Sequence, residues 1–423
     1  MRILVLGSGA REHAIILALR SEHVGHELFA APGNAGIAHD ATLVVLDPND
    51  PAAVESFAQD EAIDLVVIGP EAPLVAGVAD VLRARGIPVF GPGKAAAQLE
   101  GSKSFAKRIM DAAGVPTGRA LRAHTRAEVD AALDELGAPY VVKADGLAAG
   151  KGVIVTSDRA AALAHADAYL ADGTILIEEF LSGPEVSLFF LSDGDHVLPL
   201  SPARDFKRLR EGDAGPNTGG MGAYSPLPWL ADRYGSETEF VDLVTRGIAE
   251  PVIRQLDAEG TPFIGLLYAG LILTEDGVKV IEFNARFGDP ETQVVLPRLV
   301  DPLSALLLAA AAGTLEDQTK PAFSDAAAIT VVLASEGYPE APLTGRAIEG
   351  LDAAASVDGV HIAHAATARG AGGLVATGGR VLSVVATADS FGAARERAYR
   401  ALGEIHLEGG QFRTDIAARV AGD

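Results

Sequence analysis

The chain has 423 residues, of which 48% are hydrophobic and 22% charged, and it contains no cysteine. This composition is typical of a globular protein of roughly two to four domains, and it excludes disulfides, thiolate metal sites and cysteine nucleophiles. The net charge of −23 disfavours nucleic acid and anionic membranes as partners, and no apolar run reaches the ~18 residues of a membrane helix. We therefore expect a cytoplasmic protein with no nucleic-acid partner and no membrane partner.

The first 95 residues alternate strand and helix patterns. Strands are expected at Ile3–Leu6, Leu28–Ala31, Leu43–Leu46, Leu65–Ile68 and Val89–Phe90, with helices at Glu12–Arg20 and Val75–Arg85. This alternation predicts a parallel sheet covered by helices, which binds ligands at the carboxyl ends of its strands. Those ends carry polar or glycine-rich turns at 7–12, 32–36 and 69–71.

The turn after the first strand begins like a dinucleotide fingerprint, G-x-G-x-x-G. Glu12 stands where the third glycine is required, and no acid follows the second strand to hold a ribose. The pattern therefore argues against NAD binding. Two interpretations stay open: a phosphate received by the helix that follows Gly9, or a tight turn without a ligand.

A glycine-rich hairpin is expected at Tyr140–Thr156. Two apolar, β-branched runs flank a loop with three glycines, and Lys143 and Lys151 supply positive charge. Glycines let backbone N–H groups approach phosphate oxygens closely, so the tip is expected to close over a polyphosphate. An ordinary surface hairpin is the alternative. A P-loop is excluded, because Asp145 stands where the first glycine should be and a strand follows.

The remaining elements extend the α/β pattern. We expect a helix from Ser102 to 118 and then, over 119–190, helix, strand, loop, strand, helix and strand. A β segment at Val197–Pro202 and a long loop at Asp213–Tyr224 follow. A helix is expected at Phe240–Glu259, with a break near Pro251. Paired strands are expected at Ile264–Leu273 and Gly277–Phe283, and a helix at 301–315. Residues 325–420 are expected to form an α+β module with strands near Ala328–Leu333 and Gly379–Ala386 and a helix at Phe391–Leu402.

The strand that ends at Asn284 carries a candidate metal site. Glu282 and Asn284 are two residues apart and therefore share a strand face. A carboxylate and an amide oxygen suit Mg²⁺, which completes its shell with phosphates and water. Arg286 has the same parity and is positioned to contact a transferring phosphoryl group. The alternative is a polar outer face of an antiparallel strand.

The run Ile175–Leu181 ends in two adjacent acids. The backbone of Glu179–Leu181 is placed to bond an adenine edge, and an acid such as Glu185 to bond ribose hydroxyls. Adjacent side chains on a strand point to opposite faces, so only one of Glu178 and Glu179 faces a ligand directly. Solvated acids at a strand end are the alternative. Charges at Asp205–Arg208 also fit a solvated turn.

Seven motifs, correctly ordered and spaced, resemble the glycinamide ribonucleotide synthetase family of ATP-grasp enzymes over essentially the whole chain. They are Gly9–Ala14, Ala31–Gly36, Gly69–Leu74, Gln98–Lys103, Lys143–Gly152, Gly215–Pro226 and Glu282–Thr292. The resemblance implies an α/β, ATP-grasp fold with an N-terminal parallel-sheet domain at 1–100. It further implies an ATP-grasp domain at 101–320, with a lid subdomain at about 119–190, and a small C-terminal α+β domain at 321–423.

The same resemblance implies ATP-dependent ligation of glycine to 5-phosphoribosylamine through glycyl phosphate, by a monomer that uses ATP and Mg²⁺ or Mn²⁺. Phosphoryl transfer asks mainly for positioning and charge neutralisation, which suits a site of cations without a protein nucleophile. The other hypotheses are an ATP-grasp ligase with a different acceptor, and a regulatory binding protein with a degenerate site. Retention of the lysines and metal-type ligands argues against the second.

Residue roles follow from the resemblance position by position. The ATP-binding set is Lys103, Lys143, Gly146, Gly150, Lys151, Gly152, Glu178, Glu179, Phe180, Leu181, Glu185 and Lys207. The catalytic set is Arg286, Lys143 and Asp289; the metal ligands are Glu282 and Asn284; and the substrate set is Gly9, Arg11, Pro70, Glu71, Asn217, Thr218, Gly219 and Gly220.

Three positions depart from the family pattern. Tyr268-Ala-Gly270 stands where many ATP-grasp relatives have a further metal-binding acid, which puts a second metal in doubt. Phe206 replaces an expected histidine, and Ala285 a frequent cysteine. Neither of these two positions has to carry the chemistry.

Overall fold

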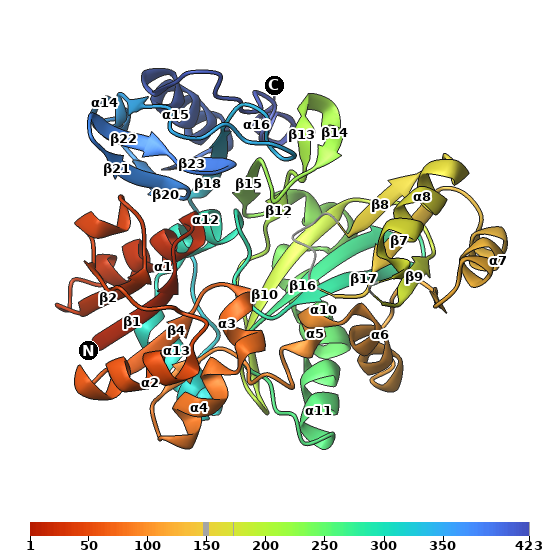
Figure 1. The fold of residues 1–423 in the computed structure, drawn as a ribbon. Coiled ribbons are helices and arrows are strands. Elements are labelled where there is room, and N and C mark those ends of the chain that lie inside the picture. Colours follow the sequence, from red (N-terminus) through yellow and green to blue (C-terminus); the bar gives the residue numbers. More distant parts are fainter. Residues whose placement is uncertain (147–151, 172, 423) are drawn as a thin grey trace.

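A computed structural model of the chain describes residues 1–146, 152–171 and 173–422 (Figure 1). Its N-terminal part is the expected parallel sheet, in the order β3-β2-β1-β4-β5. The strands are β1 (Arg2–Gly7), β2 (Glu27–Pro32), β3 (Thr42–Leu43), β4 (Leu65–Ile68) and β5 (Val89–Phe90), and the helices are α1 (Ala10–Ser21), α2 (Pro51–Asp60), α3 (Glu71–Ala76) and α4 (Val78–Ala84).

Three details of this part differ from the prediction, which did not include helix α2. The third strand stops at Leu43 instead of Leu46. The helix expected at Val75–Arg85 is two helices, because Gly77 takes a left-handed conformation with φ of 89°. Glycine adopts that conformation without steric cost, so it ends α3 and begins α4.

A second sheet forms the projecting part of the molecule in Figure 1. It is antiparallel, in the order β6-β9-β7-β8, with helices α7 (Arg126–Leu136) and α8 (Arg159–Leu170) packed on it. Its strands are β6 (Ala120–Ala123), β7 (Tyr140–Ala144), β8 (Val153–Thr156) and β9 (Ile175–Glu178). The 140–156 hairpin is therefore confirmed, whereas the prediction missed β6. Residues 147–151 of its tip, with the expected Gly150 and Lys151, lie outside the described residues.

Helices α5 (Gln98–Gly101) and α6 (Lys103–Ala112) precede this sheet. The helix predicted to run to residue 118 ends six residues earlier. Gly114 follows it with φ of 65°, and Pro116 cannot extend a helix without losing a hydrogen bond.

The third sheet is also antiparallel, in the order β11-β10-β16-β17. It consists of β10 (Glu185–Asp193), β11 (Val197–Pro199), β16 (Ile264–Thr274) and β17 (Gly277–Asn284). The helices of the same part of the chain are α10 (Glu237–Val244), α11 (Glu250–Ala258) and α13 (Leu303–Ala312). The break expected near Pro251 is a π-helical turn at Thr245–Ala249, immediately before the first turn of α11, where proline is tolerated.

The fourth sheet joins distant parts of the sequence in the order β12-β15-β18-β23-β20. Strands β18 (Ala327–Ala334), β20 (Val360–His364) and β23 (Arg380–Ala388) come from the C-terminal part, but β12 (Arg204–Asp205) and β15 (Gly222–Ser225) come from the middle of the chain. The prediction of an unstructured loop at Asp213–Tyr224 is therefore wrong in part, because β14 (Ala214–Asn217) pairs with β13 (Arg208–Arg210) and β15 enters this sheet.

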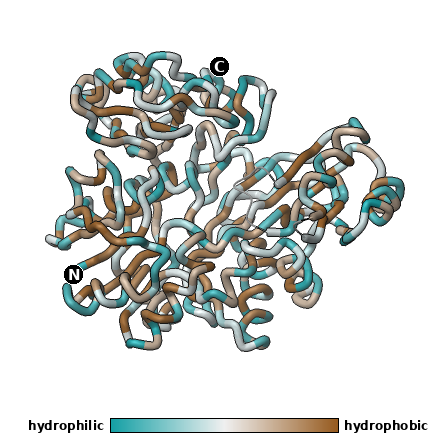
Figure 2. The backbone as a smooth tube through the Cα atoms, in the orientation of Figure 1, coloured by the Kyte–Doolittle hydropathy of each residue, from teal (hydrophilic) through white to brown (hydrophobic). Residues whose placement is uncertain are grey.

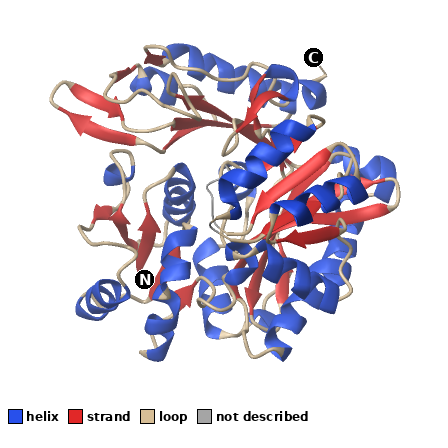
Figure 3. Cartoon of the chain, turned by 45° about the vertical axis from the view of Figure 1, so that its right-hand side comes forward, coloured by secondary structure: helices blue, strands red, loops and turns tan. Residues whose placement is uncertain are grey.

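The remaining helices and strands complete the fold. They are α9 (Ala231–Tyr234), α12 (Thr292–Val295), α14 (Leu351–Ala355), α15 (Phe391–Glu404), α16 (Ala418–Ala421), β19 (Ile348–Glu349), β21 (Thr367–Gly370), β22 (Gly373–Ala376) and β24 (His406–Leu407). Hydrophobic stretches follow the sheet strands, whereas many peripheral turns are hydrophilic (Figure 2), and helices flank the sheets (Figure 3). Within the described ranges, every helix is too short or too polar to span a bilayer.

Candidate active site

Four lysines and two glutamates form a charged group between α6, β7, β9, β13 and β17, which we call the lysine cluster. Its members are Lys103, Lys107, Lys143, Lys207, Glu178 and Glu282. One carboxylate oxygen, Glu178 Oε2, lies 3.1 Å from Lys107 Nζ and 3.0 Å from Lys143 Nζ. All three side chains are largely buried, so these ion pairs are only weakly screened by solvent.

Glu282 receives the field of the other cations. Burial alone would raise the pKa of its carboxyl, but Lys207, Lys143, Lys103 and Arg286 outweigh that effect and hold the pKa below its usual value. Glu282 is therefore ionised at neutral pH.

The side chains of Glu282 and Asn284 have no hydrogen-bond partner in the part of the chain that the structure describes. A bulge at Ile281 precedes them, since Gly270 pairs with Glu282 and Leu271 with Val280. Beyond the bulge the two residues alternate normally and share a face. A carboxylate and an amide with free oxygens fit a hard divalent cation. No group of three acidic, histidine or cysteine side chains suited to a metal occurs among the described residues.

The base of the glycine-rich tip is attached to the start of α6. Ser102 caps α6 and donates to Asp145 at 3.2 Å, while Lys103 Nζ donates to the Gly146 carbonyl at 3.0 Å. At the other end of the tip, the Gly152 carbonyl accepts from Ala144 N. The tip therefore starts beside two lysines of the cluster, Lys103 and Lys143.

The two acids at the end of β9 separate as strand geometry predicts. Glu178 is buried against lysines, whereas Glu179 is part-exposed and accepts from the Arg119 backbone at 3.0 Å. Phe180 is exposed. Leu181 lies beside Gly118. Glu185, the first residue of β10, pairs with Lys207 at 2.9 Å.

The turn after β1 is filled by a side chain of its own. Glu12 is 1% exposed and accepts from Gly9 N and from Arg11 Nε, both at 2.6 Å. A Cβ atom at Gly7, Gly9 or Gly69 would lie within 2.8 Å of Glu12. We call Gly7, Gly9, Arg11, Glu12 and Gly69 the strand-end cluster. The glycines are required because the Glu12 side chain occupies the space that the third fingerprint glycine leaves open in dinucleotide-binding proteins.

Arg286, which follows β17, connects this cluster to the third sheet. It pairs with Glu100 at 3.0 Å and lies 3.5 Å from Glu71, which follows Pro70 at the start of α3. Arg11 donates to the Phe287 carbonyl at 3.2 Å. The structure therefore brings together the predicted residues Arg11, Glu71 and Arg286.

A cavity of about 400 Å³ lies beside them. It is lined by Ser8, Gly9, Gly33, Asn34, Asp289, Ala365, Ala366, Thr367, Thr377 and Arg380. Arg380 of β23 pairs with Asp289 at 3.2 Å and donates to the carbonyl of Gly219. Thr218 hydrogen-bonds the Lys207 carbonyl, and Gly220 N donates to Thr218 Oγ1. The 217–220 segment thus lies between the cavity and the lysine cluster, while Asn217 ends β14 in an exposed position.

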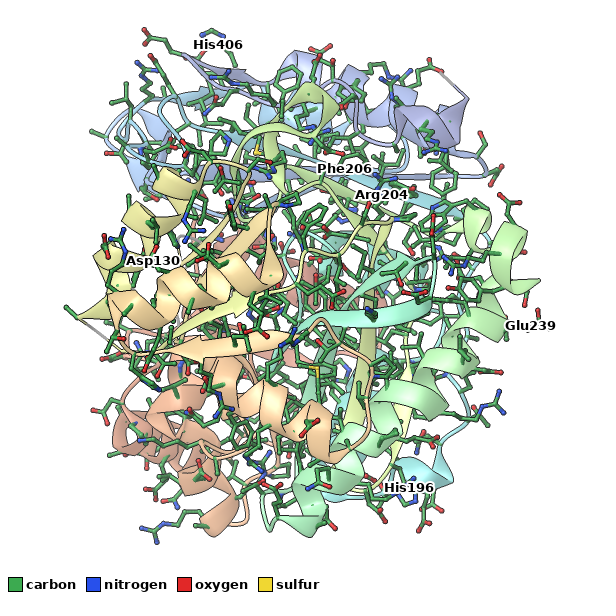
Figure 4. The ribbon with its side chains drawn as sticks, turned by 90° about the vertical axis from the view of Figure 1, so that its right-hand side faces the viewer. Asp130, His196, Arg204, Phe206, Glu239 and His406 are labelled. Atoms are coloured by element: carbon green, nitrogen blue, oxygen red, sulfur yellow. The ribbon has the colours of Figure 1, made fainter. Side chains whose placement is uncertain are left out.

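The departures from the family pattern have structural explanations. The guanidinium groups of Arg204 and Arg413 lie 5.4 and 4.9 Å from the ring centre of Phe206. Phe206 and Arg204 are neighbours in Figure 4. Tyr268 is buried and donates to Glu291 at 2.6 Å. Ala285 is buried, and its backbone N–H donates to Glu100.

Sequence reasoning missed Lys107, Glu100 and Arg380. Lys107 lies four residues after Lys103 on one helix and so on the same face, which is a signal that the sequence contained. Glu100 lies within the Gln98–Lys103 motif, although no role was assigned to it. Arg380 offered no signal, because it meets Asp289 across 91 residues of chain.

Comparisons with known proteins agree with this geometry. The phosphoribosylglycinamide synthetase models match residues 1–100 (N domain), 101–292 (ATP-grasp domain) and 328–419 (C domain). A phosphoribosylamine–glycine ligase of Leifsonia xyli is 69% identical, covering 99% of this chain and all of that one. The chain belongs to the phosphoribosylglycinamide synthetase family. A relative of the same name from Streptomyces coelicolor is 56% identical over the full length of both chains.

Solved structures show the same fold. The phosphoribosylamine–glycine ligase of Thermotoga maritima has a TM-score of 0.82 at 32% identity, covering 98% of this chain and all of that one. A biotin carboxylase domain from Hydrogenobacter thermophilus, at 18% identity and a TM-score of 0.70, shares the fold alone; it covers 97% of this chain and 91% of that one. The predicted family, ATP-grasp fold and ATP-dependent ligase class are therefore confirmed.

Proposed function

We propose that this chain joins glycine to 5-phosphoribosylamine at the expense of ATP, giving glycinamide ribonucleotide, ADP and phosphate in purine biosynthesis. The names of its relatives support these substrates. The observation that carries the chemistry is the lysine cluster around Glu282, beside a cavity that Gly9, Asp289 and Arg380 line. Cations without a protein nucleophile suit phosphoryl transfer, which depends on positioning and charge neutralisation.

In the first step, a glycine carboxylate oxygen attacks the γ-phosphorus. A P–O bond forms, the bond from that phosphorus to the β–γ bridging oxygen breaks, and ADP leaves. Lys103, Lys143 and Lys207 would neutralise the phosphates, with Gly146, Gly150, Lys151 and Gly152 in the covering tip. Arg286 would stabilise the transferred group. Its place between Glu71 and Glu100 would hold the guanidinium at a fixed position.

In the second step, the amine of phosphoribosylamine attacks the glycyl carbonyl carbon. A C–N bond forms, the C–O bond to phosphate breaks, and the proton that the amine loses passes to the departing phosphate. The phosphoribosyl group would occupy the cavity, with Gly9, Arg11, Pro70 and Glu71 on one side. Asn217, Thr218, Gly219, Gly220 and Asp289 would face glycine and its acyl phosphate.

The nucleotide would lie along β9 and β10. Glu178 would act on the nucleotide indirectly, through the lysines with which it pairs. The segment of Glu179, Phe180 and Leu181 would hold adenine, and Glu185 would hold the ribose. Glu282 and Asn284 would hold Mg²⁺ or Mn²⁺, whose charge would offset that of the phosphates. The lack of a hydrogen bond from either side chain to the described residues supports this assignment.

Domain boundaries at 100 and 320, a monomeric state and a cytoplasmic location belong to the same proposal. The N-domain match that ends at 100, the ATP-grasp match over 101–292 and the C-domain match that begins at 328 support these boundaries.

The test of the function is ADP release with ATP, glycine and freshly generated phosphoribosylamine, with each substrate omitted in turn. We expect release to require all three. Release that persists without glycine would refute the proposal. Release that depends on glycine but not on phosphoribosylamine would favour an ATP-grasp ligase with a different acceptor.

A further inference from the structure

Lys107 is a buried cation of the lysine cluster to which neither the sequence nor the family resemblance gave a role. It lies on α6, one turn after Lys103, with a side chain 12% exposed. It donates to Thr117 Oγ1 at 2.9 Å and to the Gly118 carbonyl at 2.8 Å, and it pairs with Glu178 at 3.1 Å. An ammonium group has three N–H donors, so protein acceptors use all three.

Lys143 differs from Lys107 in this respect. It pairs with the same Glu178 oxygen at 3.0 Å and donates weakly to the Ile281 carbonyl at 3.4 Å. In the described part of the chain this leaves one of its N–H donors without an acceptor. Lys143 is therefore equipped to receive a phosphate oxygen, whereas Lys107 is not.

The role of Lys107 follows from the net charge of the group that it forms with Glu178 and Lys143. A single glutamate beside a single lysine forms a neutral pair, and a neutral pair attracts a polyphosphate weakly. Two lysines on one glutamate oxygen leave a net charge of about +1 in a buried place where screening is weak. Glu178 can then fix the position of Lys143 without cancelling its charge.

We propose that Lys107 is a positioning residue for nucleotide binding: it neutralises Glu178, so that Glu178 holds Lys143 in place while Lys143 keeps its charge for the phosphates of ATP. Lys107 acts through Glu178 and does not touch the nucleotide. The inference rests on the proposed placement of the nucleotide against Lys143.

The test compares MgADP affinities, measured by titration calorimetry, of the full chain and its variants. Lys107→Met leaves Glu178 and Lys143 as a neutral pair, so we expect the Kd to rise about tenfold or more. The double variant Lys107→Met/Glu178→Gln removes both charges and frees Lys143. Its Kd is expected to return to within about threefold of the wild type.

The rescue separates this role from a structural one. If Lys107 only tied α6 to residues 117 and 118, removal of Glu178's charge would not restore binding. A Kd unchanged in Lys107→Met, or a loss that the second substitution does not relieve, would overturn the inference. Arg108→Met is the matched control, because the next cation on α6 pairs with Glu259 on the surface and should leave the Kd unchanged.

Two further measurements keep the result interpretable. Thermal melting reports folding, and if Lys107→Met does not fold, Lys107→Gln replaces it in both the single and double variants. Lys143→Met tests the nucleotide placement itself. An unchanged Kd there would defeat the placement, whereas loss in Lys143→Met without loss in Lys107→Met would defeat this inference alone.

Discussion

The strand-end cluster and the lysine cluster both concentrate charge beside glycine-rich turns, yet they are built in opposite ways. At the strand ends, Glu12 is paired by Arg11 and by the Gly9 backbone, and its side chain fills the space between three glycines. In the lysine cluster, cations outnumber the two glutamates, and the side chains of Glu282 and Asn284 make no hydrogen bond to the described residues. Charge that is satisfied internally supports the fold, whereas surplus charge is available to a ligand.

The strongest test of this contrast is Glu282→Ala. We expect ADP release at saturating substrates to fall by about a thousandfold or more, because the charged oxygen proposed to hold the metal is lost. The melting temperature should fall only modestly, because Glu282 makes no hydrogen bond to the described residues but its charge partly compensates Lys103, Lys143 and Lys207. Glu135→Ala, an exposed acid of α7, is the control. Wild-type turnover in Glu282→Ala at ordinary Mg²⁺ would refute the metal assignment.

Glu12→Gln should show the reverse behaviour. It leaves the Arg11 guanidinium without its buried carboxylate, so we expect the free energy of unfolding in urea to fall by about 3 kcal/mol. Glu27→Gln removes an exposed partner of Arg2 and should cost about 1 kcal/mol or less. If the two substitutions had equal effects, Glu12 would not be the structural support of the turn.

The smallest expected effect concerns His364, which joins the C-terminal part to the strand ends. Its backbone N–H donates to His13 Nδ1 at 2.8 Å, and its carbonyl accepts from Asn34. Burial lowers the pKa of His364 to about 4. The unfolded chain, with an ordinary value near 6.5, then binds more protons at low pH, so stability is complete above about pH 6.5 and falls toward pH 4.

We expect the titration of His364 to lower the free energy of unfolding by about 2 kcal/mol when the pH is lowered from 8 to 5, measured by urea unfolding. His364→Asn, which cannot titrate but keeps a group able to bond Thr367, should remove that part of the pH dependence. An unchanged slope in the variant would assign the effect to other groups.

Local patterns sufficed for much of the fold. The alternation at 1–95, the 140–156 hairpin and the strands 264–273 and 277–283 appear where periodicity placed them, because apolar spacing follows directly from strand and helix geometry. Segment ends were less predictable. Gly77 divides one predicted helix, and Gly114 with Pro116 shortens another.

Of the site, the sequence by itself determined which residue types are present and which of them share a strand face, as Glu282 and Asn284 do, because such relations depend only on neighbours along the chain. Only the tertiary structure decided that Glu178 joins Lys107 to Lys143, that Arg380 reaches Asp289, and that β12 and β15 enter the C-terminal sheet. These contacts join residues far apart in sequence, and a linear pattern contains no record of the packing that brings them within a few ångströms of one another.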